Sequence, residues 1–332
     1  MSTFDNQCCF SARLRNVRHL AAVIKSIHFK DIATCRISPD GLTFILEESR
    51  CLFGRCLIQK QIFEDFKFVP PMAEATPFGS QSHQGTEYAS HQGTQSGSNQ
   101  QYSQRMPSGY GTDGTINFGI NLATLLSCLN MFGTAVWSTT QGGENNNNAI
   151  GSGFGSGPIT AIKLSYNGIG SKFNLTLEDD GVVTTCGVPT FDPEPPVDFE
   201  FNEENHSKII MKAQWLEEGL RDLDATSDRV VIRLSPEIPH LRISSLGTIE
   251  NLDVNYSQGD VIETFVYQYD RPIEISYNFL HVQKVLLVCP MATKANLAID
   301  SKDFMRIQFL LPVVEHKYLF AEYSFSPLEA LD

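Results

Sequence analysis

The sequence predicts an α+β protein made of two similar halves, each with two helices among antiparallel strands. Three observations lead to this prediction. Strand-like runs and helical periodicity recur in the same order in residues 1–188 and 201–328. A segment with four prolines and four acidic residues, 189–200, separates the two halves. Hydrophobic residues make up 42% of the 332-residue chain, which is enough to build the cores of two domains.

The first half begins with a strand-like run at residues 10–14, followed by helical periodicity over 16–28. Apolar residues of this helix recur every three or four positions and form one stripe, made of Val17, Leu20, Ala21, Ile24 and Ile27. After the turn Ser38-Pro39-Asp40, we expect strands at 42–46 and 115–119 and a second helix at 121–132. Three strands then close this half, at 159–166, 173–177 and 182–186.

The second half repeats this order. A strand at 209–213 precedes a helix at 214–223, and a similar turn, Ser235-Pro236-Glu237, follows. The remaining pattern predicts strands at 241–243 and 274–277, a helix at 279–288, and strands at 295–300, 306–311 and 318–325. The helices that begin each half carry a single apolar stripe. We therefore expect the helices to cover one face of a sheet and to turn their other face toward solvent or a ligand.

Two segments of the first half differ in composition from their surroundings. Residues of about 70–114 are dominated by Gln, Ser, Gly, Thr and His, and residues of about 138–157 contain four consecutive asparagines. Such segments bury too little apolar surface to offset the entropy cost of ordering, so we predict two disordered insertions. The predicted organisation is a first domain at 1–188, a connector at 189–200 and a second domain at 201–328.

Composition excludes several classes of protein. The formal net charge of −13 argues against a protein that binds nucleic acid with its whole surface. No apolar run approaches the roughly 20 residues of a membrane span, and the first residues do not resemble a signal peptide. The eight cysteines form no CxxC pair and have no zinc-ligand spacing, so we expect no metal or other cofactor and reduced cysteines in an intracellular protein.

One helix face runs against the acidic average. Arg15, Arg18 and Lys25 fall on the side opposite the apolar stripe of the first helix, with Lys30 just beyond it. Residues 1–69 hold ten basic and seven acidic side chains, so this part of the chain is net positive. Such a face binds phosphate groups as a row of point charges, or it is an ordinary solvated surface; the spacing alone leaves both open.

The densest carboxylate cluster is Glu178-Asp179-Asp180, followed by Gly181. A metal-dependent nuclease needs several carboxylates converging on its metal ions. An Asp-Gly pair between two strand-like runs is more typical of a hairpin turn. No motif of a serine hydrolase, zinc peptidase, P-loop or dinucleotide-binding enzyme is present. The sequence therefore favours a non-catalytic protein, with a nuclease as the alternative.

Long stretches of the chain resemble one family. They include Phe10–Arg18 (FSARLRNVR), Ile27–Asp31 (IHFKD), Phe63–Lys67 (FEDFK), Leu177–Thr184 (LEDDGVVT) and Leu223–Ser227 (LDATS). With the duplicated strand–helix unit and the acidic connector, they resemble the sliding-clamp superfamily of proliferating cell nuclear antigen. Within it, the chain is most similar to the Rad-one subunits of the DNA-damage checkpoint clamp.

The resemblance implies a sliding-clamp fold, in a nuclear ring of three subunits that encircles duplex DNA at damage sites and supports checkpoint signalling and repair. Its other subunits would be Rad-nine and Hus-one proteins, and a clamp loader would place the ring on DNA. Helices line the pore in this family, so the exposed helix faces become candidate phosphate contacts, namely Arg15, Arg18, Lys25, Lys30, Arg221, His281 and Lys284. Acidic residues of the third helix, Glu217, Glu218 and Asp222, would oppose DNA there.

The resemblance also implies two kinds of protein contact. Ring closure would use edge strands that contain Gly181, Val182, Val183, Thr184, Thr248, Ile249, Leu252 and Val254. The connector would help to line a groove for partner peptides through Phe191, Val197 and Phe199, or these residues would simply anchor it. Two alternatives remain: a 3′–5′ exonuclease, because relatives have been described as such, and a homotrimeric replication clamp.

Overall fold

The computed structural model describes residues 8–70, 109, 114–133, 159–194, 199–247, 251–257, 259, 261–313 and 317–329. The two predicted insertions fall almost entirely outside these residues. In the first half, the elements are β1 (Phe10–Leu14), α1 (Val17–Lys25), β2 (Ile32–Ser38), β3 (Gly41–Glu48), β4 (Leu52–Gln59), a 3₁₀ turn (Lys60–Ile62), β5 (Asp65–Phe68), β6 (Ile116–Asn121), α2 (Leu122–Leu129), β7 (Ala161–Tyr166), β8 (Phe173–Asp179), β9 (Val182–Val188) and β10 (Thr190–Phe191).

The second half repeats these elements in the same order. They are β11 (His206–Lys212), α3 (Ala213–Asp222), β12 (Arg229–Leu234), β13 (Leu241–Leu246), β14 (Asn251–Tyr256), β15 (Ile262–Val266), β16 (Ile273–Asn278), α4 (Phe279–Val282) with the 3₁₀ turns η2 (Gln283–Leu287) and η3 (Cys289–Met291), β17 (Lys294–Asp300), β18 (Met305–Pro312) and β19 (Tyr318–Phe325). The predicted duplication of strand–helix units is confirmed.

Three antiparallel sheets contain these strands. A five-stranded sheet has the order β5-β1-β7-β8-β9, and a four-stranded sheet has the order β14-β13-β12-β16. The third sheet, β10-β6-β2-β3-β4-β19-β18-β17-β11-β15, crosses from one half to the other where β4 pairs with β19. Each half thus contributes two blocks of strands. One block is five-stranded, β5-β1-β7-β8-β9 in the first half and β15-β11-β17-β18-β19 in the second, and the other has the order β4-β3-β2-β6 in the first half and β14-β13-β12-β16 in the second. The β4–β19 pair joins one block of each half into a continuous sheet.

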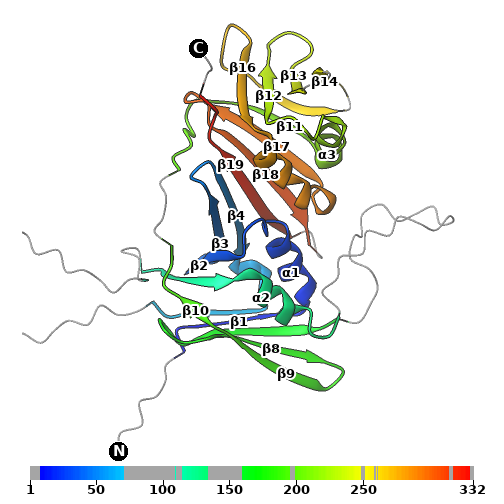
Figure 1. The fold of residues 1–332 in the computed structure, drawn as a ribbon. Coiled ribbons are helices and arrows are strands. Elements are labelled where there is room, and N and C mark those ends of the chain that lie inside the picture. The colour runs from blue at the N-terminus through cyan, green and yellow to red at the C-terminus, as the bar shows by residue number, and fades with distance from the viewer. Residues whose placement is uncertain are drawn as a thin grey trace, which may run out of the picture.

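The first helix forms where its pattern predicts. All five residues of its apolar stripe are buried, and the side chain of Asn16 caps the helix by accepting a hydrogen bond from the backbone N–H of Arg18 at 3.0 Å. Asn121 caps α2 and Asn278 caps α4 in the same way. Figure 1 shows α1, α2 and α3 along one side of the molecule, while residues 192–194, just after β10, lie on the opposite side.

The fourth predicted helix is only partly α-helical. The pattern predicts one helix over 279–288, but the α-helix α4 has four residues and continues as the 3₁₀ turns η2 and η3. Three β-branched valines, Val282, Val285 and Val288, lower helix propensity, and Pro290 disfavours an α conformation at the residue before it. The apolar spacing still identifies the side of this segment that packs into the core, because all three valines are buried.

The two halves meet around the ring of Tyr323 on β19. Its hydroxyl donates a hydrogen bond to the backbone carbonyl of Ser26, just after α1, and its ring lies 6.0 Å from that of Phe29 and 6.2 Å from that of Phe309. Gly54, its cross-strand partner on β4, leaves room for the Phe29 ring, because a Cβ at Gly54 would come within 2.5 Å of that ring. This cluster therefore joins the end of α1 and the strand β4 of the first half to the strands β18 and β19 of the second half.

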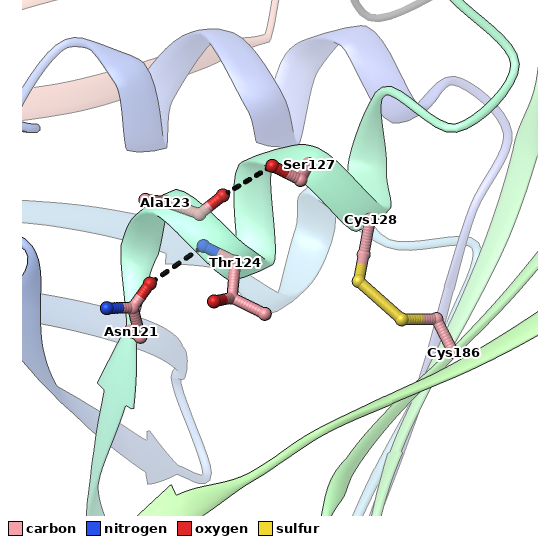
Figure 2. Close-up of a disulfide and its surroundings, with 6 residues drawn as sticks. All are labelled: Asn121, Ala123, Thr124, Ser127, Cys128 and Cys186. Atoms are coloured by element: carbon pink, nitrogen blue, oxygen red, sulfur yellow. Dashed lines mark hydrogen bonds between the residues drawn. A yellow bond between two sulfur atoms is a disulfide. The ribbon is translucent and has the colours of Figure 1, made fainter.

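The expectation of fully reduced cysteines is wrong for one pair. A disulfide joins Cys128, at the end of α2, to Cys186 on β9 (Figure 2). Cys8, Cys35, Cys51, Cys56 and Cys289 form no disulfide among the described residues. The two bonded cysteines are 58 residues apart, and only the packing of α2 against β8 and β9 brings them together. Their spacing in the sequence could not reveal this.

Acidification is expected to destabilise the protein through His19, which is buried in α1. Burial and, to a lesser extent, the neighbouring charge of Arg18 lower the pKa of His19 to about 4. The unfolded chain, with a pKa near 6.5, binds more protons between these two values, so stability falls as the pH falls through this window. From pH 7.5 to 5.0 this histidine should account for a loss of about 2 kcal/mol.

Urea denaturation at the two pH values checks this expectation. His19→Gln and His19→Leu should differ from each other in absolute stability, yet both should lose about 2 kcal/mol less than the wild type on acidification. An unchanged difference between the two pH values in both variants would contradict the assignment to His19.

Candidate subunit and nucleic-acid interfaces

β9 and β14 are edge strands, and their counterparts in the other half of the repeat are β19 and β4. β9 is the last strand of the five-stranded sheet, as β19 is the last strand of the five-stranded block of the second half. β14 is the last strand of the four-stranded sheet, as β4 is the last strand of the matching block in the first half. Within the chain, β4 and β19 pair with each other. β9 and β14 lie at opposite ends of the molecule (Figure 1), and no described strand pairs with their outer edges. Such edges present unpaired backbone N–H and C=O groups to another chain.

The side chains of the two edges differ. On β9, Val182 and Val183 are 56% and 60% exposed, so this edge is apolar. On β14, the residues alternate between an exposed polar row and a more buried row that faces α3; the exposed row consists of Asn251, Asp253 and Asn255. The last residue of β14, Tyr256, is buried, and its hydroxyl donates to the backbone carbonyl of Trp215 on α3 at 3.0 Å.

The predicted interface residues lie mostly on these two strands. Val182, Val183 and Thr184 belong to β9, and Leu252 and Val254 belong to β14. Gly181 lies instead in the turn before β9. Thr248 and Ile249 lie outside the described residues.

The acidic cluster forms the predicted hairpin turn. β8 ends at Asp179 and β9 begins at Val182, and the two residues between them, Asp180 and Gly181, have φ values of 46° and 78°. Positive φ at both central positions is the signature of a tight two-residue hairpin. The side chain of Asp179 accepts a hydrogen bond from the Thr160 hydroxyl at 2.9 Å. Among the described residues, no group of three or more His, Cys, Asp or Glu side chains is placed to hold a metal ion.

Three of the predicted phosphate contacts are engaged by carboxylates of the chain itself. The Nε of Arg15 lies 2.9 Å from Glu64, and Nζ of Lys30 lies 3.0 and 3.1 Å from the two carboxylate oxygens of Glu194 in the connector. Arg221 is paired with Glu217, one turn away on α3, at 2.9 Å. These pairs reduce the positive charge available to a phosphate.

The remaining predicted contacts sit on α1 and near α4. Lys25 is exposed in the last turn of α1, and Arg18 is half-buried in its first turn. Lys284 follows α4 in η2. Burial, with a smaller contribution from Lys284, lowers the pKa of His281 although Glu48 opposes the shift. At neutral pH, His281 is therefore uncharged and attracts a phosphate less than the lysines do.

Comparison with known proteins places the chain in a family. The model of the repair-protein family Rad1/Rec1/Rad17 matches residues 9–311. The chain belongs to the Rad1 family. It is 27% identical to the mouse cell cycle checkpoint protein RAD1, an alignment that covers 97% of this chain and 94% of the mouse protein. It is 22% identical to the DNA repair exonuclease REC1 of Mycosarcoma maydis, over 96% of this chain and 90% of REC1.

The fold of this Rad1-family chain is that of the sliding clamps. The crystal structure of proliferating cellular nuclear antigen from Entamoeba histolytica superposes with a TM-score of 0.64 at 12% identity, covering 97% of this chain and all of that one. The clamp fold expected from the sequence is thus confirmed. The likeness is one of fold, and it coincides with the duplicated topology described above.

The two described groove residues of the connector of this Rad1-family chain differ in exposure: Phe199 is half-buried and Phe191 is exposed. Phe199 lies between Phe53 and Phe304, with ring centroids 4.9 Å away on each side, so it anchors the connector. Phe191 is 49% exposed and lines a small cavity of about 180 Å³ beside Phe118 and Thr190. Val197 lies outside the described residues. Among the described residues predicted to line the peptide groove, Phe191 is the exposed one.

Sequence reasoning overlooked two features of this site. The carboxylates of Glu64 and Glu194 come from segments far from their cationic partners, and nothing in the sequence predicts these pairs. The polar row of β14 was visible, since the run Asn-Leu-Asp-Val-Asn-Tyr alternates with the period of two expected for a strand with one exposed face.

Proposed function

We propose that this Rad1-family chain is a non-catalytic subunit of a nuclear three-membered ring that encircles DNA and serves as a platform for checkpoint and repair proteins. The observation that carries the proposal is the repeat in its topology. β4 and β19 join the two halves, whereas no described strand pairs with the outer edges of their counterparts, β14 and β9, at opposite ends of the molecule. Head-to-tail pairing of such edges generates a closed ring when the rotation per subunit allows it.

The two halves can be aligned residue by residue. Asn121 and Asn278 both cap helices, so β4 corresponds to β14 with Arg55 matching Asp253 and Leu57 matching Asn255. The backbone N–H groups that begin α1 and α3 bond to Thr160 and Thr293, so β9 corresponds to β19. In this second alignment Val183 matches Phe320 and Thr185 matches Glu322.

This alignment favours two different partner chains over a homotrimer. At the junction within the chain, Arg55 pairs with Glu322 at 2.8 Å and Leu57 lies opposite Phe320. The same register between two copies of the chain would set Asp253 opposite Thr185 and the amide of Asn255 opposite Val183. It would replace an ion pair and an apolar pair by two mismatched pairs. We propose that the partners are the Rad-nine-like and Hus-one-like subunits implied by the sequence resemblance, loaded on duplex DNA by a clamp loader.

The domain division at 189–200 is part of this proposal. Residues 1–188 and 201–328 would form the two clamp domains, with the connector on the side away from the helices. The helix side would then face the DNA, without reading base sequence, because contacts to phosphates carry no sequence information.

Removing two cations from the helix side is expected to weaken DNA association. In the assembled ring, Lys25→Ala and Lys284→Ala together should reduce the salt dependence of duplex binding, with a slope smaller by about 0.9 for every phosphate that is no longer neutralised. The measurement is retention on a closed circular duplex as a function of salt concentration. Ring assembly should be unaffected, because neither residue lies on β9 or β14.

A matched control removes the same number of charges from residues that pair with carboxylates. Lys30→Ala and Arg221→Ala together should change the salt slope much less, because their partners are Glu194 and Glu217. An equal effect of the two double variants, or loss of ring assembly in the first, would contradict the placement of the DNA on the helix side.

A nuclease is the second candidate, because the relative from Mycosarcoma maydis is named an exonuclease. The carboxylates available to it here are Glu178, Asp179 and Asp180, at the β8–β9 turn. We propose that this turn is structural. Degradation of end-labelled DNA by the purified protein, abolished by alanine at these three positions, would overturn the non-catalytic assignment.

A further inference from the structure

A cavity of about 530 Å³ opens between the two halves, beside the ends of α1 and α4. The first half contributes Phe29, which follows α1, and the second half contributes residues of α4 and η2. This volume lies within the range of pockets that hold small organic groups. The cavity is separate from the open strand edges and from the connector, so neither of the interfaces described above accounts for it.

The apolar part of the cavity wall consists of Phe29 and the leucines Leu280, Leu286 and Leu287. Leu280 on α4 is 60% exposed and Leu287 in η2 is 40% exposed, although both lie on the helix side of the molecule. The ring of Phe29 is held in place by Tyr323 at 6.0 Å and by the space above Gly54. A flat aromatic group that entered the cavity would meet an aromatic ring and three leucine side chains.

The rim of the cavity carries hydrogen-bonding groups, one lysine and one carboxylate, that of Glu48. The side-chain carbonyl of Asn278 accepts from the backbone N–H of His281 at 3.1 Å, which leaves its amide NH₂ to donate. Gln283 offers a second amide, and Lys284 offers a positive charge. Amide side chains bind the edges of nucleobases, and lysine binds phosphate. The exposed Lys25 is close by, since the backbone N–H of His28, another lining residue, bonds to its carbonyl at 3.2 Å.

From these features we infer that the cavity binds one unpaired nucleobase of single-stranded DNA. This inference rests on the proposed function, which places DNA on the helix side. An apolar, aromatic floor suits the π-face of any base, and the amide rim and Lys284 suit its edge and its phosphate. A base within a duplex is stacked and paired, so only an unpaired base is free to enter. The chain would thus distinguish single-stranded or gapped DNA from intact duplex.

A neutral change to the cavity tests the inference without altering the charge of the surface. Leu280→Ser with Gln283→Ala, in the full-length chain, should lower affinity for a 20-nucleotide oligothymidine at least about five-fold, the effect of losing one stacked base. Affinity for a 20-base-pair duplex should stay within about two-fold. Met131→Ser, which changes an exposed apolar residue just after α2, is the matched control and should alter neither affinity. Fluorescence anisotropy of labelled DNA measures both.

Photocrosslinking locates the base directly. A single 5-iododeoxyuridine in the oligothymidine should crosslink to the peptide that contains Phe29 or to the one that contains His281, and pairing it in a duplex should abolish the adduct. Equal losses on both DNAs, or no loss on either, in the Leu280→Ser, Gln283→Ala variant would overturn the nucleobase assignment.

Two further outcomes separate this inference from the function on which it rests. Wild-type ring that retains duplex but gives no crosslink would overturn the cavity assignment and leave the clamp proposal standing, whereas failure of the ring to retain duplex would overturn both.

A peptide is the competing occupant of the cavity. If the Leu280→Ser, Gln283→Ala variant weakens recruitment of a protein to the ring while its DNA affinities are unchanged, the cavity binds a peptide and the nucleobase assignment is wrong.

Discussion

Replacing Tyr323 with alanine is expected to lower the free energy of unfolding by about 3–5 kcal/mol, the range for removing a large aromatic side chain from a core. The Tyr323 ring is completely buried between Phe29 of the first half and Phe309 of the second. Burial raises the pKa of Tyr323 well above 10, so its hydroxyl keeps the proton that it donates to the carbonyl of Ser26. The variant loses the packing of the ring and leaves this carbonyl without its donor.

Urea denaturation followed by circular dichroism measures the loss. Tyr323→Phe separates the two contributions, because it keeps the ring and removes only the hydroxyl. It should cost about 1–3 kcal/mol, the penalty for leaving a buried polar group unsatisfied. A loss in Tyr323→Ala no larger than that in Tyr323→Phe would mean that the ring does not hold the two halves together.

The helices α1, α2 and α3 and the duplication were predictable because their signals are local. The stripe of Val17, Leu20 and Ile24 repeats with the period of a helix, and the Ser-Pro-Asp and Ser-Pro-Glu turns mark the same place in both halves. The hairpin at Asp180-Gly181 was predictable for the same reason. In each case, a few neighbouring residues determine the backbone conformation, so no knowledge of the tertiary structure is needed.

Features that depend on distant residues were not predictable. The carboxylate that engages Lys30 comes from Glu194, 164 residues further along the chain, and the partner of Cys128 is 58 residues away. The cavity beside Phe29 and Leu280 exists only because two halves pack together. Arg221 is the exception among the engaged cations. Its partner Glu217 lies four residues earlier on the same helix, a spacing at which the sequence alone indicates an ion pair.

The open edges could be predicted as strands but not as equivalents of an existing junction. Residues 182–186 and 251–256 look like other half-exposed strands, and only the sheet order shows that β9 and β14 occupy the places of β19 and β4. The β4–β19 pair therefore serves as a template, formed within this chain, for how two subunits would pair.

A single charge on the apolar edge is expected to prevent ring formation. In the alignment of the two halves, Val183 is the equivalent of Phe320, which lies opposite the apolar Leu57 at the β4–β19 junction. Val183→Asp therefore places a carboxylate opposite the equivalent position of the neighbouring subunit. Burying an unpaired carboxylate in such a contact costs several kcal/mol, which lowers subunit affinity by at least about a hundred-fold. Size-exclusion chromatography with light scattering on the co-expressed subunits should show this chain separated from its β9 partner.

The folded subunit itself should tolerate Val183→Asp. Val183 is 60% exposed in the isolated chain, so its replacement does not disturb the core. Ile159→Asp, which places the same charge at another exposed apolar residue of the first half, outside β9, is the matched control and should assemble normally. Normal assembly of Val183→Asp would contradict pairing through β9. Failure of both variants would point to a general intolerance of negative charge. Loss in Val183→Asp alone would tie ring closure to the edge that repeats the internal β4–β19 junction.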